Sequence, residues 1–165
     1  MLGDQQITVL DYADDIAVLS ESEHDLQVFV DKVIFFGNLV ALKINPDKSK
    51  VMSFCSLPPR IIINGLQLES VEQFRYLGSL ISANTSCEKD VLSRIGFAQA
   101  SFQRLFTALF SREDISINTK MHVYLALIRT VLLYGCKSWN ITAALASTLD
   151  SCEMTFFTQD IGCFK

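Results

Sequence analysis

Two short, largely apolar runs near the start of the chain flank an acidic turn. Residues 7–10 (Ile-Thr-Val-Leu) and 16–19 (Ile-Ala-Val-Leu) lie on either side of Asp11-Tyr-Ala-Asp-Asp15. Short apolar runs separated by a polar turn are typical of paired β-strands. The pattern therefore predicts a β-hairpin whose tip carries adjacent acidic residues.

A helix is expected directly after this hairpin. Ser22 stands three residues before Asp25, which is the spacing of a capping-box-like helix start. Apolar residues then recur at helical spacing and predict a helix over residues 24–41 with one apolar face. The stripe consists of Leu26, Phe29, Val30, Val33, Phe36 and Val40.

The segment between residues 51 and 82 is predicted to contain short strands. Residues 51–54 and 74–82 are strand candidates by composition. Residues 61–68 are predicted to form a second hairpin, closed by Asn64-Gly65. This dipeptide favours a hairpin because it tolerates the positive φ angles of a type I′ turn.

The apolar period becomes helical from about residue 88. A long helix is predicted there, followed by a second one over residues 118–134 that is apolar nearly all round and hence expected to be deeply buried. Gly135 is its expected C-cap, and a third helix is predicted over residues 143–158. The stripe of the first helix consists of Val91, Ile95, Ala98, Phe102, Leu105 and Leu109.

The order of these elements predicts an α+β fold class. Strands and one helix fill residues 1–85, and helices fill residues 86–165, so two structural segments are expected. Half of the residues are hydrophobic, which is too apolar for a disordered chain.

The chain shows no membrane or secretion signal. No stretch reaches the roughly 18 apolar residues that a membrane span requires, and the first residues lack a basic start followed by an apolar block. We therefore expect an intracellular location, cytoplasmic or nuclear, and no membrane partner.

The net charge of −4 by itself opposes binding to nucleic acid. Its distribution is uneven, because residues 1–50 hold nine acidic and four basic residues, whereas residues 88–137 hold seven basic and four acidic ones. This order fits carboxylates that bind a metal, followed by an element that meets phosphates. Ordinary solvated faces would give the same counts.

The five cysteines are scattered, and no Cys-x-x-Cys occurs. Neither histidine has a second candidate ligand close by in the sequence, whereas structural zinc sites use paired ligands at short spacing. We expect reduced, mostly buried thiols rather than a metal site.

Asp14 and Asp15 are the main candidates for chemistry. Two adjacent carboxylates at a hairpin tip repel each other unless a cation is present, and Mg²⁺ prefers such oxygen ligands. Two Mg²⁺ ions held by carboxylates are able to activate a 3′-hydroxyl and stabilise the leaving pyrophosphate in nucleotidyl transfer. The alternative is an ordinary turn, in which Asp supports local hydrogen bonds.

Four motifs resemble those of non-LTR (LINE-type) retrotransposon reverse transcriptases. Residues 12–20 (Tyr-Ala-Asp-Asp-Ile-Ala-Val-Leu-Ser) resemble the family's motif C turn, and residues 40–50 resemble its motif D. Residues 74–79 (Phe-Arg-Tyr-Leu-Gly-Ser) match the strand that follows in the family. Residues 132–139 (Leu-Leu-Tyr-Gly-Cys-Lys-Ser-Trp) are similar to a signature in the helical region beyond the palm.

This resemblance implies a fold and an activity. The expected fold is part of a polymerase palm over residues 1–85, with three to five mixed or antiparallel strands and one helix, followed by a helical thumb-like region over residues 86–165. The implied activity is RNA-directed DNA polymerisation with Mg²⁺, an RNA template and a DNA primer.

The resemblance also assigns roles to single residues. By this resemblance, Asp14 and Asp15 would be the catalytic metal ligands. The positive charges of Arg94, Arg104 and Lys120, apart from the resemblance, make them candidates for sequence-independent phosphate contacts. Tyr134 and Trp139 either stack on bases or belong to the core. The residues implied near the nucleotide or the primer end are Tyr12, Ala13, Lys48, Phe74, Tyr76, Leu77 and Gly78.

Departures from the family bear on activity. A palm polymerase needs a further aspartate on a neighbouring strand, which in the family lies upstream, and eleven residues precede Tyr12. The expected protein is therefore a catalytically incomplete fragment, inactive alone, that self-associates through exposed palm surface. The alternatives are a non-catalytic nucleic-acid-binding or interaction remnant and, more distantly, a palm-like nucleotide cyclase.

Overall fold

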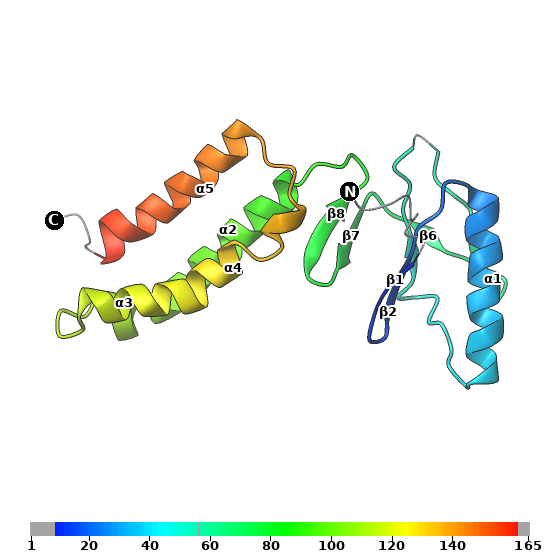
Figure 1. Cartoon of the computed structure of the whole chain (residues 1–165), viewed down its shortest axis with the longest axis horizontal. Helices are drawn as coiled ribbons and strands as arrows, with labels where there is room; N and C mark the ends of the chain where they lie inside the picture. The colour runs from blue at the N-terminus through cyan, green and yellow to red at the C-terminus, as the bar shows by residue number, and fades with distance from the viewer. Residues whose placement is uncertain (1–8, 56, 162–165) are drawn as a thin grey trace, which may run out of the picture. The chain divides into compact units, whose positions relative to one another are not determined.

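A computed structural model describes residues 9–55 and 57–161 of the 165-residue chain. Contacts between backbone positions divide these residues into two compact units, one up to Phe74 and one from Arg75 onward (Figure 1). The boundary falls within the strand that precedes the helices, so the second unit includes most of the hairpin before them. The sequence-based division after residue 85 concerns palm-like and thumb-like segments, and it stays a prediction.

The first unit begins with the predicted acidic hairpin. Strands β1 (Val9–Tyr12) and β2 (Asp15–Val18) pair antiparallel, and Tyr12 lies opposite Asp15 as the last pair before the turn. The hairpin prediction is confirmed over these residues. Residues 7 and 8 of the predicted first strand lie outside the described ones.

Helix α1 (Glu23–Leu39) confirms the predicted helix and its start. The hydroxyl of Ser22 accepts a hydrogen bond from the Asp25 backbone amide at 3.0 Å, so it satisfies one of the free amides of the first turn. The side-chain amide of Gln27 donates to the Ile62 carbonyl at 2.9 Å, and its oxygen accepts from the Ile62 amide at 2.8 Å. These two bonds fix α1 against the following hairpin.

That hairpin consists of β4 (Ile62–Ile63) and β5 (Leu66–Gln67), and it turns through Asn64 and Gly65 as predicted. Both residues have positive φ angles, 51° and 80°, which is the feature that the Asn-Gly dipeptide indicates. A small core lies beneath α1. It consists of Val51, Ile61, Ile63 and Leu68, packed against Leu26, Val30, Ile34 and Ile44.

The predicted single sheet of three to five strands is wrong for the described residues. They form four separate two-stranded ladders. One ladder is parallel and joins β3 (Lys50–Val51) to β6 (Glu69–Ser70), so the strand expected over residues 51–54 is reduced to a two-residue contact. The strands of this ladder are shorter than the usual length of about three to ten residues.

Residues 74–82 also differ from the prediction of one strand. They form a hairpin of β7 (Gln73–Tyr76) and β8 (Ser79–Ser82), with Leu77 and Gly78 in the turn. Leu77 has a φ angle of 47° and Gly78 one of 83°, and these two positive angles reverse the chain.

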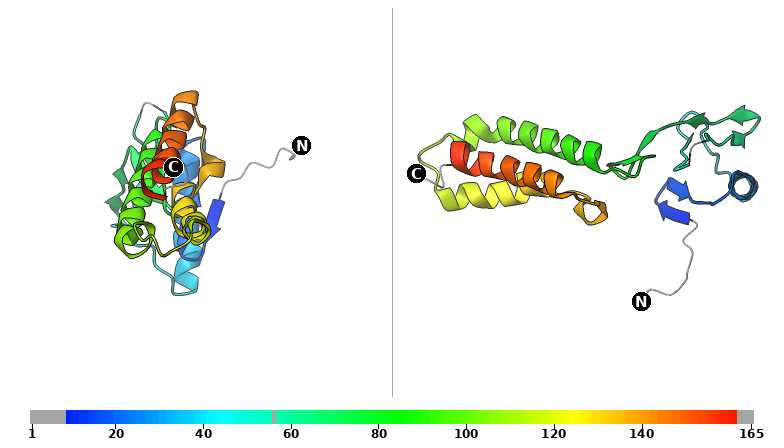
Figure 2. Two further views of the ribbon diagram at one scale, coloured as in Figure 1. Left: turned by 90° about the vertical axis from the view of Figure 1, so that its left-hand side faces the viewer. Right: turned by 90° about the horizontal axis from the view of Figure 1, so that it is seen from above.

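The remainder of the second unit is helical. Its helical segments run side by side (Figure 2). The predicted first and third helices are confirmed, and each continues into a π-helical turn. The elements are α2 (Glu88–Leu105), η1 (Phe106–Phe110), α3 (Ile117–Val123), η2 (Tyr124–Arg129), α4 (Thr130–Leu132), η3 (Cys136–Ser138), α5 (Ala143–Thr155) and η4 (Phe156–Ile161).

Aromatic rings fill the centre of this helical unit. Phe102 is fully buried, and its ring lies 4.3 Å from that of Phe110 and 4.7 Å from that of Phe156, measured between centroids. Tyr124 is also buried and donates to the Glu153 carboxylate at 3.1 Å. Burial and the neighbouring Glu153 charge raise the pKa of the Tyr124 hydroxyl above its usual value, so the hydroxyl keeps its proton.

The predicted second helix is less buried than its composition indicates. Along α3, η2 and α4, the buried apolar residues are Tyr124, Ile128 and Leu132, four positions apart on one face. Leu125 and Leu127 are exposed because only one side of this helix faces its neighbours. The expectation of burial all round is therefore wrong.

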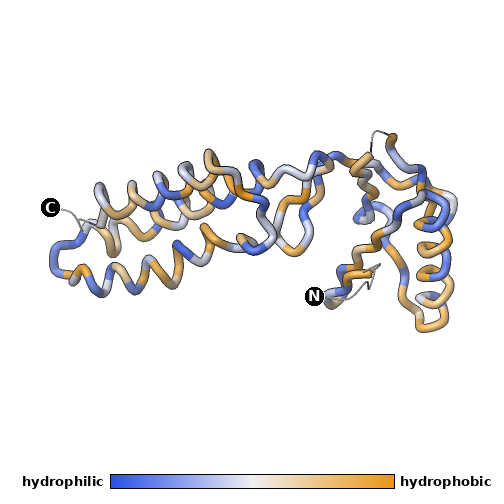
Figure 3. Tube along the Cα trace, turned by 45° about the horizontal axis from the view of Figure 1, so that its top comes forward, coloured by the Kyte–Doolittle hydropathy of each residue, from blue (hydrophilic) through white to orange (hydrophobic). Residues whose placement is uncertain are grey.

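Apolar residues are also exposed on the first unit. Figure 3 shows apolar residues around much of α1, and Phe35, Phe36 and Leu39 are each more than half exposed. No described helix is both long enough and apolar enough to cross a membrane. Exposed apolar groups of this kind are typical of surfaces that contact another molecule.

The four cysteines at described positions are free thiols. Cys87 and Cys152 are half-buried, whereas Cys55 and Cys136 are exposed, so the prediction of mostly buried thiols is wrong for the latter two. The fifth, Cys163, lies outside the described residues.

Candidate functional site

The tip of the β1–β2 hairpin presents the two candidate carboxylates. The turn residues are Ala13 and Asp14, because Tyr12 and Asp15 form the last strand pair. Ala13 has a φ angle of 55°, a conformation that residues with a Cβ adopt at a cost of roughly 1–3 kcal/mol and that is often found at functional sites. Asp14 and Asp15 are both exposed.

Both carboxylates are available to a ligand. Within residues 9–55 and 57–161, neither the Asp14 nor the Asp15 carboxylate has a hydrogen-bond or ion-pair partner. Adjacent, unpaired carboxylates fit a hard cation such as Mg²⁺, which prefers oxygen ligands. The same described residues contain no group of three or more acidic, His or Cys side chains that would hold a metal. The turn therefore presents two carboxylates, fewer than such a group of three.

Lys48 lies in a separate turn of the first unit. The side-chain oxygen of Asn45 accepts from the Asp47 amide at 3.0 Å, and the Asn45 carbonyl accepts from the Ser49 amide at 3.1 Å. This turn leaves Lys48 exposed, as a phosphate contact would require. Lys50, two residues later, is instead paired with Glu69 at 2.5 Å.

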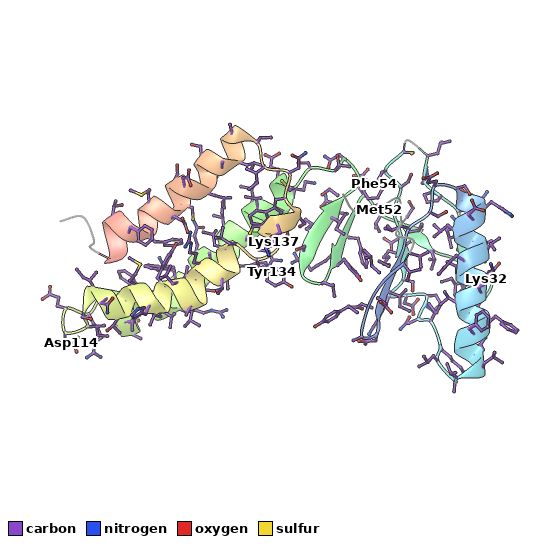
Figure 4. All side chains as sticks on the ribbon, viewed as in Figure 1. Lys32, Met52, Phe54, Asp114, Tyr134 and Lys137 are labelled. Atoms are coloured by element: carbon purple, nitrogen blue, oxygen red, sulfur yellow. The ribbon has the colours of Figure 1, made fainter. Side chains whose placement is uncertain are left out.

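The Leu77–Gly78 turn is held by the helical unit. The Tyr134 hydroxyl donates to the Leu77 carbonyl at 2.8 Å, and the Arg94 guanidinium donates to the Gly78 carbonyl. Figure 4 labels Tyr134 beside the β7–β8 hairpin. Two of the sequence motifs, Tyr-Leu-Gly and Leu-Leu-Tyr-Gly, are thus in direct contact. The Tyr134 hydroxyl therefore has a structural partner, the Leu77 carbonyl.

Asp90 is a central residue of this contact that the sequence did not indicate. Its carboxylate is 3% exposed and accepts from the Leu80 amide and from the Trp139 indole nitrogen, each at 2.9 Å. It also lies 3.8 Å from Nε of Arg94. Trp139 thus has a structural partner, in line with the core alternative. An acidic residue in the first turn of a helix gives no sequence signal for such a role, because this is an ordinary position for it.

The sequence of the first unit and the start of the second matches a known family. Residues 2–81 match the family model described as reverse transcriptase (RNA-dependent DNA polymerase). Residues 2–81 belong to the reverse transcriptase family. The match includes the acidic hairpin and the Leu77–Gly78 turn, and ends within β8.

Curated relatives extend the similarity through the helical unit. The RNA-directed DNA polymerase from mobile element jockey of Drosophila funebris is 23% identical over 151 residues, which cover 86% of this chain and 16% of the relative. A transposon-derived protein of Caenorhabditis elegans is 24% identical over 147 residues, which cover 86% of this chain and 52% of that protein. The chain is thus a reverse transcriptase segment of the non-LTR retrotransposon kind, and it spans a minor part of the jockey polymerase. No solved structure matches.

The predicted nucleic-acid contacts of this reverse transcriptase segment fall into two groups. Arg94 is 7% exposed, and Lys120 is buried with its ammonium donating to the Phe110 carbonyl at 2.7 Å. Both cations are bonded to backbone carbonyls of the second unit, Arg94 to that of Gly78 and Lys120 to that of Phe110, and their role as phosphate contacts stays a prediction. Arg104 is exposed, as a phosphate contact would require.

Replacing Gly135 with alanine is expected to destabilise the reverse transcriptase segment by about 1–3 kcal/mol. Gly135 has a φ angle of 78°, and a Cβ there would lie 2.7 Å from the Ser79 hydroxyl. Urea unfolding, followed by far-UV circular dichroism, measures the change. In a Ser79→Ala background the clash disappears, so a smaller loss is expected. An equal loss in both backgrounds would show that the close approach contributes nothing.

Proposed function

We propose that this chain supplies the catalytic turn and the primer-facing hairpin of an RNA-directed DNA polymerase. The observation that carries the proposal is the pair of exposed, unpartnered carboxylates beside the strained Ala13 at the tip of a hairpin within the family match. Residues 1–85 would be palm-like and residues 86–165 thumb-like.

Asp14 and Asp15 would hold Mg²⁺, with Asp14 as the main ligand. When bound, Mg²⁺ supplies positive charge that activates a 3′-hydroxyl and stabilises the pyrophosphate leaving group. The carboxylates contribute two fixed negative charges at a turn that a nucleic acid is able to approach. Tyr12, 66% exposed next to the turn, would contact the primer end or the incoming nucleotide. Lys48 would add a positive charge toward phosphates.

A third metal ligand would come from outside the described residues. Asp11 lies in β1 opposite Ile16, on the same hairpin as the pair. It does not reproduce a ligand held by a neighbouring strand. We therefore propose that the described residues alone are catalytically incomplete, and that a carboxylate from a further segment or a second molecule completes the site. The exposed apolar side chains of α1 fit such an association.

The RNA template and the DNA primer would meet the Leu77–Gly78 hairpin and the exposed basic residues. Phe74 and Tyr76, in β7, would support this hairpin from within, since both are half-buried. Leu77 is 38% exposed and offers an apolar contact to the primer end. Arg104 would bind phosphates in a sequence-independent manner, as backbone contacts do.

Metal binding at the turn tests this proposal. Paramagnetic Mn²⁺, added to the full ¹⁵N-labelled chain, is expected to broaden the amide signals of residues 12–16. The signals should stay sharp in an Asp14→Asn/Asp15→Asn variant, which keeps the size of both side chains and removes their charge. Lack of broadening in the folded wild-type chain would refute the proposed metal site.

Primer extension on an RNA template with Mg²⁺, using the same two proteins, tests whether the catalytic site lacks a further carboxylate. Metal binding without extension would support the proposal that a further carboxylate is required. Extension by the wild-type chain that vanishes in the variant would show a complete polymerase site and overturn that part. Salt-dependent binding of template–primer without metal binding would instead favour a non-catalytic nucleic-acid-binding role.

A further inference from the structure

The Leu77–Gly78 turn is bonded through its two backbone carbonyls to Arg94 in α2 and to Tyr134 just after α4. Tyr134 donates to the first at 2.8 Å, and Arg94 donates to the second. Arg75, on the hairpin itself, also donates to the Gly78 carbonyl at 3.2 Å. Backbone carbonyls in exposed hairpin turns ordinarily bond to water, so side-chain donors on both are a specific feature of this turn.

Arg94 is itself held in one orientation. Its guanidinium carbon lies 4.4 Å from the centre of the Tyr134 ring, a cation–π contact, and its Nε lies 3.8 Å from Asp90. Asp90 accepts from the Leu80 amide of β8 and from the Trp139 indole. Side chains of the helical unit are therefore bonded to the hairpin at Leu77, Gly78 and Leu80.

The same two side chains also contact the glycine of the turn. A Cβ on Gly78 would lie 3.6 Å from the Tyr134 ring and 3.7 Å from the Arg94 guanidinium, so both side chains pack directly on the glycine backbone. The Leu77 side chain is 38% exposed. The turn is thus bonded through its carbonyls while it presents an apolar side chain to solvent.

A buried ion pair is weak evidence for stability, since apolar residues of similar volume often stabilise a fold equally well. The charged groups of such a pair do fix the position of the atoms that they bond to, because a charged donor with fixed partners holds its acceptor in one place. We infer that Asp90, Arg94 and Tyr134 are positioning residues that fix the Leu77–Gly78 turn against the helices. This inference rests on the proposed function, in which the turn contacts the primer end, and it makes Tyr134 a holder of the turn rather than a platform for bases.

The first arm of the test measures amide hydrogen exchange in the turn without nucleic acid. Tyr134→Phe removes one hydroxyl and keeps the ring beside Arg94, and Arg94→Lys keeps the charge and removes the planar guanidinium. Amide exchange at residues 78–80 is expected to become about threefold to tenfold faster in each variant. The indole signal of Trp139, the single tryptophan of the chain, reports whether the helical unit remains folded. Lys89→Gln, an exposed change beside Asp90, is the matched control and should leave exchange unchanged.

The second arm uses the full chain with an RNA template and a DNA primer that carries a photoreactive 3′-terminal base. Cross-links at residues 76–79 are expected in the wild-type chain and should fall at least about threefold in Tyr134→Phe, while total binding stays the same. Unchanged exchange and unchanged cross-linking in both variants would overturn the inference. A wild-type chain that binds template–primer but gives no cross-link at the turn would refute the proposed primer contact instead. In that case the exchange arm still decides whether these residues fix the turn.

Discussion

Replacing Asp90 with alanine is expected to lower the free energy of unfolding of the helical unit by about 3–5 kcal/mol. The substitution leaves the buried Arg94 without its counter-charge, and it removes the acceptor of the Leu80 amide and of the Trp139 indole. Buried donors that lose their acceptor retain the full penalty of desolvation. Urea unfolding followed by far-UV circular dichroism measures the loss, because tryptophan fluorescence responds directly to the removal of the Asp90 carboxylate.

The double substitution Asp90→Ala/Arg94→Met is the control for this prediction. It removes both charges and replaces the arginine with an apolar side chain of similar length, so part of the loss should be recovered. Asp90→Asn is expected to give an intermediate loss, since an amide keeps one acceptor oxygen for two donors. A loss below about 1 kcal/mol in Asp90→Ala would contradict the buried network.

Replacing Phe102 with alanine is expected to destabilise the helical unit by about 3–5 kcal/mol. Phe102 is fully buried, and its ring stacks on Phe110 at an interplanar angle of 15° and contacts Phe156 from η4. Truncation removes apolar contacts on two sides and leaves a cavity between α2 and the C-terminal helix. Thermal or urea unfolding, monitored by Trp139 fluorescence and circular dichroism together, measures the effect.

Phe97→Ala provides a matched control on the same helix. Phe97 is 44% exposed and lies 5.8 Å from the Arg75 guanidinium. Its truncation is expected to change the free energy of unfolding by about 0.5–1 kcal/mol, as for other surface positions. Equal losses at positions 97 and 102 would show that the aromatic cluster is not the centre of the core.

Local sequence signals predicted the elements whose ends are set by nearby residues. Ser22 determines where α1 begins because its hydroxyl bonds to an amide three residues away. Asn64-Gly65 closes a hairpin because both residues tolerate positive φ angles. In each case the responsible interaction lies within a few positions of the chain.

The Leu77–Gly78 turn was not predicted for a physical reason. Leucine rarely adopts a positive φ angle, so its presence indicated a continuous strand. The bonds to the turn come from Arg94 and Tyr134, 16 and 57 positions away. Asp90 was missed for the same reason, since its partners Leu80 and Trp139 lie 10 and 49 positions away.

The number of buried residues in the second predicted helix depends on how many other helices pack against it. An apolar composition indicates preference for burial but not the number of partner helices. Here the buried face is a single line through Tyr124, Ile128 and Leu132. The candidate site shows the opposite case, because Asp14 and Asp15 are adjacent in the sequence and lie together at one hairpin tip whatever the long-range packing.

The close approach of Ser79 and Gly135 has a consequence for how related sequences diverge. A Cβ at position 135 would lie 2.7 Å from the Ser79 hydroxyl, so one of the two groups would have to shift. A lineage that first changes Ser79 to alanine or glycine would tolerate a later side chain at position 135 more readily than one that changes in the reverse order. Substitutions at the two positions are therefore expected to be correlated and ordered, as historical contingency would produce.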